Sequence, residues 1–221
     1  MGSENMSEMR DFVLGTPAIV CRWRLANRQV LLENRHVRAL SKRTLGEEKV
    51  PTTLVAWVKQ HLEWTLKEGA FAHPDGVLML VIDEAGQAAM TVGPYEPLAQ
   101  TGVLDLAARA ALAHDEAERT GIAPECLWLV QGDTLVWGID RDHDPSGAST
   151  LVNDLAHTLG LRVARQPGLA ELVGSGSVAY DGAFLVSDEH GVVAARNLPS
   201  TLSEKFAASY QRLFEKTARI A

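Results

Sequence analysis

The chain has 221 residues, of which 46% are hydrophobic and 22% charged, and its formal net charge is −7 at pH 7. This composition indicates a globular protein, large enough for one large domain or two small ones, and argues against a disordered chain. The negative charge argues against nucleic-acid binding, which depends on clustered lysine and arginine.

No apolar run reaches the roughly 18 residues of a membrane-spanning helix, and the polar, acidic start lacks the apolar core of a signal peptide. Cys21 and Cys126 lie far apart, in apolar surroundings and outside any CxxC pair. This placement predicts buried, reduced thiols and no disulfide framework. We therefore expect a soluble, cytoplasmic protein that binds neither nucleic acid nor a membrane.

Alternating apolar residues predict two strands over 18–32, followed by a short helix over 36–42. A longer helix is expected over 51–67, since proline suits its first turn and leucine or valine recurs every four residues. The next two strands, 77–82 and 88–92, flank a turn ending in Gly86. Prolines and glycines cluster between 93 and 102, which predicts a domain boundary there.

The second half begins with an alanine-rich helix, expected over 104–120 and ended by Gly121. The pattern then predicts a hairpin of strands (126–130 and 134–137), a helix (150–159), a strand (162–165), a short helix (169–173) and two more strands (183–186 and 192–195). The last helix starts with a predicted capping box from Thr201 to Glu204. We thus expect an α/β (α+β) protein with a smaller N-terminal domain at 12–98 and a larger one at 103–221.

Seven cations fall within the first fifth of the chain. They suit either the solvent-facing side of strands and a helix or a site for a phosphate or carboxylate ligand, and the sequence leaves both interpretations open. They are Arg22, Arg24, Arg28, Arg35, Arg38, Lys42 and Arg43.

The acidic loop at 140–144 is spaced like a calcium loop, but Pro145 stands where the sharp turn needs glycine. Leu151 also replaces the bidentate glutamate of such loops. A transition-metal site built on His143 and carboxylates is an alternative, but the sequence offers no second cluster to complete it. A solvated loop is the favoured interpretation.

Several segments of the second half match, in order, the motifs of one enzyme family. They are residues 112–117 (LAHDEA), 127–137 (LWLVQGDTLVW), 146–149 (SGAS), 155–163 (LAHTLGLRV), 180–185 (YDGAFL) and the terminal helix at 201–214. This half resembles the larger domain of the class IV pyridoxal-phosphate aminotransferases, which include branched-chain and D-amino acid aminotransferases and aminodeoxychorismate lyases. The resemblance implies a two-domain fold and a homodimer.

The resemblance also implies a ligand site. Gly147, Ala148 and Ser149 correspond to the backbone amides that cradle the cofactor phosphate, and residues 187–188 (Ser187 and Asp188) correspond to a second phosphate-binding segment, with Asp188 in place of its threonine. In the first half, residues 36–40 (HVRAL) faintly resemble a family motif, which makes Arg38 the candidate for its phosphate-binding arginine.

The residues needed for the family's chemistry are missing. Its Schiff-base lysine corresponds to Gly102 or Val103, and the chain has no lysine between Lys67 and Lys205. The glutamate that pairs with the pyridine nitrogen lies in a segment deleted here, and a carboxylate at Asp188 would repel a phosphate. We therefore expect no pyridoxal phosphate cofactor.

Two functions follow from the resemblance. The first is a degenerate family member that has lost pyridoxal-phosphate catalysis and binds another small anionic ligand or a protein partner. The alternative is an active aminotransferase or lyase, either with a relocated lysine, for which Lys59 and Lys67 are the candidates, or using other groups of the same cleft. If the resemblance were accidental, the sequence would indicate an α/β protein and nothing more.

Overall fold

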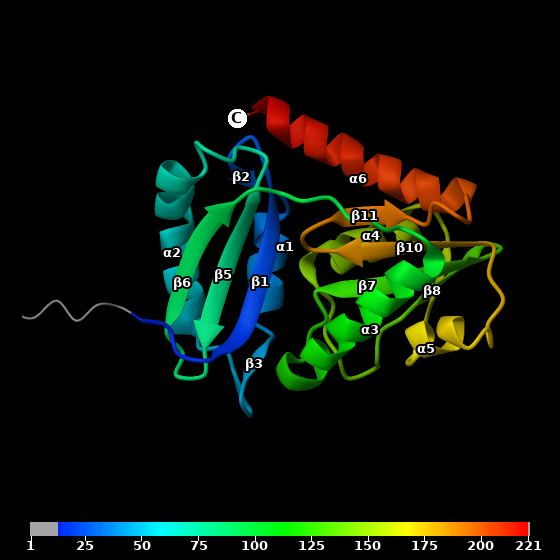
Figure 1. The fold of residues 1–221 in the computed structure, drawn as a ribbon, viewed down its shortest axis with the longest axis horizontal. Coiled ribbons are helices and arrows are strands. Elements are labelled where there is room, and N and C mark those ends of the chain that lie inside the picture. The colour runs from blue at the N-terminus through cyan, green and yellow to red at the C-terminus, as the bar shows by residue number, and fades with distance from the viewer. Residues whose placement is uncertain (1–12, 221) are drawn as a thin grey trace, which may run out of the picture.

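The computed structural model describes residues 13–220, so the polar start of the chain and the predicted domain edge at residue 12 lie outside the described residues. Two sheets stand side by side, each with its own helices (Figure 1). Residues 94–102 connect them without helix or strand. None of the helices within 13–220 has the length and apolar character needed to cross a membrane.

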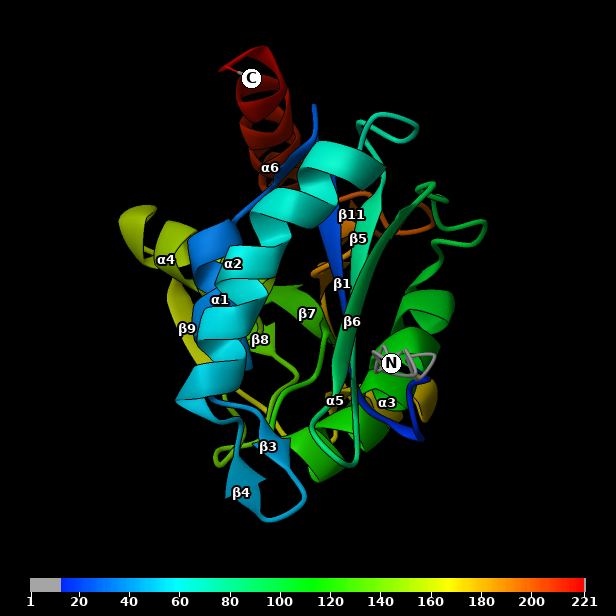
Figure 2. The ribbon, with the colours of Figure 1, turned by 90° about the vertical axis from the view of Figure 1, so that its left-hand side faces the viewer.

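The first sheet has the strand order β2-β1-β5-β6. Its members are β1 (Pro17–Ala26), β2 (Gln29–Val30), β5 (Val77–Asp83) and β6 (Ala88–Gly93), and all neighbours are antiparallel. Helices α1 (Glu33–Leu40) and α2 (Thr52–Gly69) lie along one face (Figure 2). The inward residues of β1, such as Cys21 and Trp23, pack there with Val58 and Leu62 of α2.

The second sheet has the order β11-β10-β7-β8-β9. Its strands are β7 (Glu125–Gln131), β8 (Thr134–Trp137), β9 (Arg162–Arg165), β10 (Gly182–Ser187) and β11 (Gly191–Ala194), and only the β8–β9 pair is parallel among them. Its central strands β7 and β10 are buried on both faces, which explains why their sequences are almost continuously apolar.

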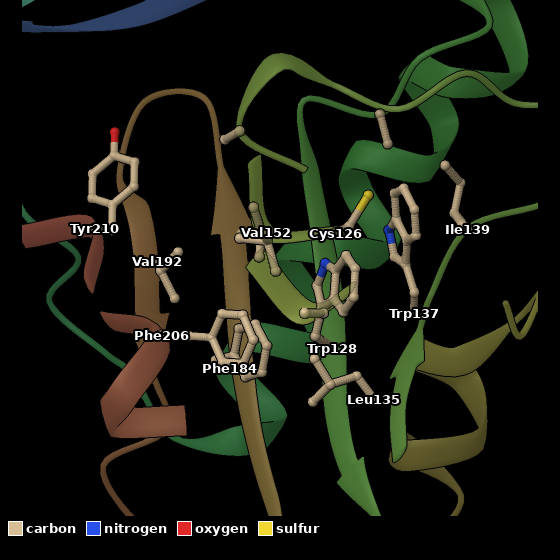
Figure 3. Close-up of a cluster of buried hydrophobic side chains, with 14 of the residues drawn as sticks. Cys126, Trp128, Leu135, Trp137, Ile139, Val152, Phe184, Val192, Phe206 and Tyr210 are labelled. Carbon is tan, nitrogen blue, oxygen red and sulfur yellow. The ribbon is translucent and has the colours of Figure 1, made fainter. Parts of the chain in front are cut away.

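Helices cover both faces of this second sheet. One face packs against α3 (Val103–Thr120) and α5 (Leu169–Gly174), and the other against α4 (Gly147–Thr158) and α6 (Thr201–Ile220). On the α4–α6 side, Phe184 stacks on Trp128 and Phe206, with ring centroids 6.0 and 5.4 Å apart (Figure 3). This aromatic stack is the centre of the largest apolar cluster.

The predicted elements are all present, but some boundaries were wrong. Helix α4 begins at Gly147 and not near residue 150, because the Ser146 side chain accepts a hydrogen bond from the Ser149 amide and caps the helix there. Helix α6 begins at Thr201, as predicted, and the Glu204 amide donates to the Ser200 carbonyl at 2.9 Å, while the capping box stays a prediction. A small hairpin, β3 (Thr44–Leu45) with β4 (Glu48–Lys49), was missed because two-residue strands carry no periodic signal.

Both cysteines are free and buried, as predicted from their apolar surroundings.

Candidate functional site

A cavity of about 210 Å³ lies between the two sheets. Strand β1 supplies one wall through Val20 and Arg22, which alternate with the inward-facing Cys21 and Trp23. The cavity therefore faces the side of the first sheet that α2 does not cover. The full lining is Val20, Arg22, Arg109, Leu112, Ala113, Glu116, Pro124, Glu125, Ser187 and Glu189.

A fixed ion pair lines the cavity. Arg109 on α3 donates to both oxygens of Glu125, through Nε at 2.9 Å and Nη2 at 2.8 Å. The Ser187 hydroxyl also donates to Glu125, at 2.9 Å. A bidentate pair with a third hydrogen bond is among the stronger charge-assisted arrangements in proteins, so these groups are held in place.

His190 lies against this ion pair, with Nε2 3.3 Å from Nη2 of Arg109 and Nδ1 3.4 Å from the Tyr95 hydroxyl. Burial and the neighbouring arginines lower the pKa of His190 to about 4, against the attraction of Glu125. The imidazole is consequently neutral at pH 7 and contributes no charge next to the Arg109–Glu125 pair.

The rim of the cavity carries a looser pair. Nε of Arg22 is 3.9 Å from Oε2 of Glu189, and the Arg22 side chain is 55% exposed. Burial raises the pKa of Glu189 despite the attraction of Arg22. A weak, half-solvated pair of this kind exchanges partners at little cost, so Arg22 and Glu189 are available to a bound ligand.

The N-terminus of α4 holds an internal anion. Asp188 is 6% exposed, and its Oδ1 accepts a 2.8 Å hydrogen bond from the Ala148 amide. Its Oδ2 lies 3.5 Å from Nδ1 of the buried His36. Burial alone would raise the pKa of Asp188, but the attraction of His36, the Ala148 hydrogen bond and the charge of Arg43 outweigh it and leave the pKa lowered. The helix end is thus occupied by a carboxylate of the same chain.

His36 comes from the other half of the molecule and is positioned by two contacts. Its ring stacks on Trp23, with centroids 5.3 Å apart and planes 12° from parallel. Gly147 lets the ring lie against α4, because a Cβ there would clash with the imidazole and sit only 3.0 Å from the His36 backbone nitrogen. His36 lies in the segment 36–40 that resembles a family motif, but that motif made Arg38 the candidate and gave His36 no role.

A second buried pair joins the same two halves. The Arg43 guanidinium is hydrogen-bonded to Glu116 on α3 and lies 3.2 Å from the Thr120 hydroxyl. Burial raises the pKa of the adjacent Cys21 to about 11, although Arg43 opposes the shift, so this thiol stays protonated. Arg43 therefore ties the halves together and does not activate a nucleophile.

The residues predicted as a ligand site separate in the structure. Gly147, Ala148 and Ser149 are buried at the start of α4, where the Ala148 amide donates to Asp188 and the Ser149 amide to the Ser146 hydroxyl. Ser187 lines the cavity. Arg38 is exposed and lines a small hollow of about 30 Å³ with Arg35, Ala39, Lys42, Pro145 and Thr150.

Chemically, the cavity is suited to binding charged groups. Its described lining contains two arginines and three glutamates but no lysine, cysteine or histidine. Glu116 is already paired with Arg43, and Ser187 with Glu125. Within the described residues, the one group of histidines and carboxylates close enough to share a metal ion lies elsewhere, between α3 and the loop before α4.

Replacing Gly147 by alanine is expected to destabilise the protein by about 1–3 kcal/mol, because the new methyl group displaces His36 from the α4 terminus. Urea unfolding followed by circular dichroism measures the change. Gly174→Ala is the matched control, since a Cβ there meets nothing within 4 Å and alanine favours its helix. Equal stabilities of the two variants would contradict the close approach of His36.

Asp188→Asn is expected to cost roughly 3 kcal/mol at pH 7, because it removes one partner of a buried pair. The lowered pKa of Asp188 means that the folded carboxylate adds stability above the ordinary value of 3.8 and loses it as pH falls further. The gap in unfolding free energy between wild type and variant should therefore shrink below about pH 4. A gap that stays constant from pH 7 to pH 3 would rule out this charge effect.

No family model matches the sequence, and no curated protein matches it. Several solved structures, in contrast, are similar to this chain in fold. The chain is similar to 4-amino-4-deoxychorismate lyase from Pseudomonas aeruginosa, with a TM-score of 0.55 and 16% identity over 88% of this chain and 90% of that one.

Two further solved structures are similar to this chain to the same degree. A hypothetical aminotransferase from Mycobacterium tuberculosis, bound to α-ketoglutarate and PMP, has a TM-score of 0.57 and 14% identity over 89% of this chain and 88% of its own. The fold IV-transaminase CpuTA1 from Curtobacterium pusillum has a TM-score of 0.57 and 11% identity over 92% and 85%. At such identities the likeness concerns architecture, and this chain has the two-domain fold of the class IV aminotransferases and aminodeoxychorismate lyases.

Proposed function

We propose that this chain is a class IV aminotransferase-like protein that does not carry out pyridoxal-phosphate catalysis and instead binds a small ligand with an anionic group in the cavity between its sheets. The observation that carries the proposal is the Asp188 carboxylate on the Ala148 amide. That amide belongs to the segment whose family counterpart cradles the cofactor phosphate. An anion supplied by the chain itself takes its place here.

The residues present do not fit pyridoxal phosphate. A phosphate dianion at the start of α4 would meet the buried Asp188, and two like charges in such a site repel strongly. The position of the Schiff-base lysine falls at Gly102 or Val103. Gly102 caps α3, and the Val103 side chain is buried in an apolar cluster, so neither position offers an amine.

A relocated lysine is not supported either. Lys59 and Lys67 are exposed on α2, which packs against the first sheet through Val58 and Leu62. The cavity faces the opposite side of that sheet, through Val20 and Arg22. The strands of the sheet therefore stand between either amine and the cavity, which disfavours the alternative of an active pyridoxal-phosphate enzyme.

The ligand class follows from the charges of the cavity. Arg109 and Glu125 satisfy one another, which leaves Arg22 for an anionic group and Glu189 for a cationic one. The volume of about 210 Å³ is below the roughly 300–1,000 Å³ of typical ligand sites. A small zwitterion, such as a free amino acid, matches both the size and the pair of charges.

The proposal keeps two expectations that came from the sequence. The class IV resemblance implies a homodimer, and the highly exposed Leu112 beside the cavity is an apolar group that a second copy would cover. The reduced state of the two buried cysteines agrees with a cytoplasmic location.

Loss of the cofactor is tested first with pyridoxal phosphate and borohydride. We expect no stoichiometric adduct on a single lysine and no turnover of amino acids. A stoichiometric, reducible adduct together with turnover would overturn the proposal.

The role of Asp188 is tested with inorganic phosphate. Asp188→Thr removes the internal anion and leaves the α4 amides beside His36 and Arg43, so phosphate should bind at least about tenfold tighter than to wild type, by titration calorimetry. Asp142→Thr, which removes an exposed carboxylate of the same charge, is the control and should behave like wild type. No gain of binding in a folded Asp188→Thr protein would contradict the idea that Asp188 fills an anion site.

The cavity is tested with free amino acids as zwitterionic probes in a thermal-shift assay. An amino acid that raises the melting temperature of wild type should lose at least about tenfold in affinity with Arg22→Gln, since the charge that holds its carboxylate is gone. Arg38→Gln removes an arginine outside the cavity and should leave binding unchanged. A larger loss with Arg38→Gln would move the ligand site to the basic surface of α1.

A further inference from the structure

Four side chains capable of binding a metal converge at the surface between α3 and the loop that follows β8. His114 and Glu118 are four residues apart on α3 and so share one side of the helix. Asp140 and His143 come from the loop. Each residue offers one donor atom, and the four atoms all lie within 4.8 Å of one another.

The separations are close to those of a metal-bound set. Nε2 of His114 is 3.3 Å from Oε1 of Glu118 and 3.8 Å from Oδ2 of Asp140. Nε2 of His143 is 3.7 Å from the same Glu118 oxygen. Bonds of about 2.0–2.1 Å in a tetrahedral site place neighbouring donors roughly 3.3 Å apart. The remaining donor pairs lie within 4.8 Å, so shortening each separation by at most about 1.5 Å would complete the geometry.

The charges of the cluster call for a cation. Within the described residues, Glu118 and Asp140 have the two imidazoles, and no lysine or arginine, as ion-pair partners within 4.0 Å. The nearby Asp144 differs, because it is paired with Lys42 at 2.7 Å and with Lys49 at 3.9 Å. Two carboxylates facing two imidazoles without a basic side chain repel one another when the imidazoles are neutral.

The loop is fixed before any ion binds. The Arg165 guanidinium lies 3.3, 3.4 and 3.5 Å from the backbone oxygens of Asp140, Arg141 and His143. The Asp144 amide donates to the Gly121 carbonyl at the end of α3, at 3.0 Å. The His143 side chain is 11% exposed, and that of Glu118 is 61% exposed. The cluster is therefore buried on the His143 side and accessible to an ion from solvent on the Glu118 side.

We propose that His114, Glu118, Asp140 and His143 bind one divalent transition-metal ion, with Zn²⁺ as the best match. Two imidazole donors argue against Ca²⁺ and Mg²⁺, which take oxygen ligands, and two imidazoles with two carboxylates suit four-coordinate Zn²⁺. The ion would join α3 to the loop that leads into α4. The ion would lie outside the cavity, and it would hold α3, which carries Glu116, against the loop that leads to the start of α4.

The test uses the full chain after treatment with a chelator. Calorimetric titration with Zn²⁺ should show one equivalent bound, and Co²⁺ should give the visible absorption of a tetrahedral site. Saturating Zn²⁺ should also raise the melting temperature, because the ion binds the folded chain. The absence of a stoichiometric site for either metal would overturn the proposal.

Matched variants locate the ion. His143→Ala and Asp140→Asn should each weaken Zn²⁺ binding at least about tenfold and abolish the Co²⁺ spectrum. His157→Ala and Asp142→Asn remove an exposed imidazole and an exposed loop carboxylate outside the cluster, so they should bind as wild type does.

Folding is monitored by the melting temperature without metal. If removing His143 unfolds the loop, His114→Ala on the helix surface gives the same test with less disturbance. Binding that survives both histidine substitutions, or that is lost equally in the controls, would exclude this cluster as the site.

Discussion

The burial of the Asp188 carboxylate between the start of α4 and His36 is the interaction on which the packing of the two halves depends. A buried carboxylate is costly unless amides and cations surround it, and here the Ala148 amide, His36 and Arg43 do so. His36 and Arg43 belong to the first half, whereas Asp188 and α4 belong to the second. The charge is buried where the two halves meet, so the interactions of Asp188 with His36 and Arg43 also join them.

Two neighbouring regions between the sheets have different properties. At the start of α4 the Ala148 amide is taken by Asp188, whereas near α3 a cavity remains, lined in part by the loosely paired Arg22 and Glu189. Because Asp188 follows Ser187 directly, one segment serves both regions: Ser187 donates to Glu125, and Asp188 accepts from the Ala148 amide of α4. Under the proposed function, an aminotransferase fold keeps its cavity while the Asp188 carboxylate stands in for the cofactor phosphate.

The sequence predicted the elements with strong periodicity, since α2, α3 and the strand pairs each bury a face that apolar spacing reveals. By resemblance, it also led to the expectation that Asp188 would oppose a phosphate. It did not reveal that Asp188 itself accepts from the Ala148 amide beside His36, which is 152 positions earlier in the chain. From the sequence, Arg43 was expected on the surface or in an anion site, whereas it is buried and paired with Glu116. Pairs between distant segments leave no local pattern.

The loop before α4 is a second case in which side chains from distant segments form a group that the sequence does not reveal. Judged alone, residues 140–144 fail the calcium pattern, and His143 lacks companions. The fold supplies them because α3 runs past this loop and presents His114 and Glu118 to it. In this group, His114 and Glu118 are four residues apart on a helix, and Asp140 and His143 are three residues apart in a loop. Neither half is distinctive in sequence, so only the packing of α3 against the loop makes the four side chains one group.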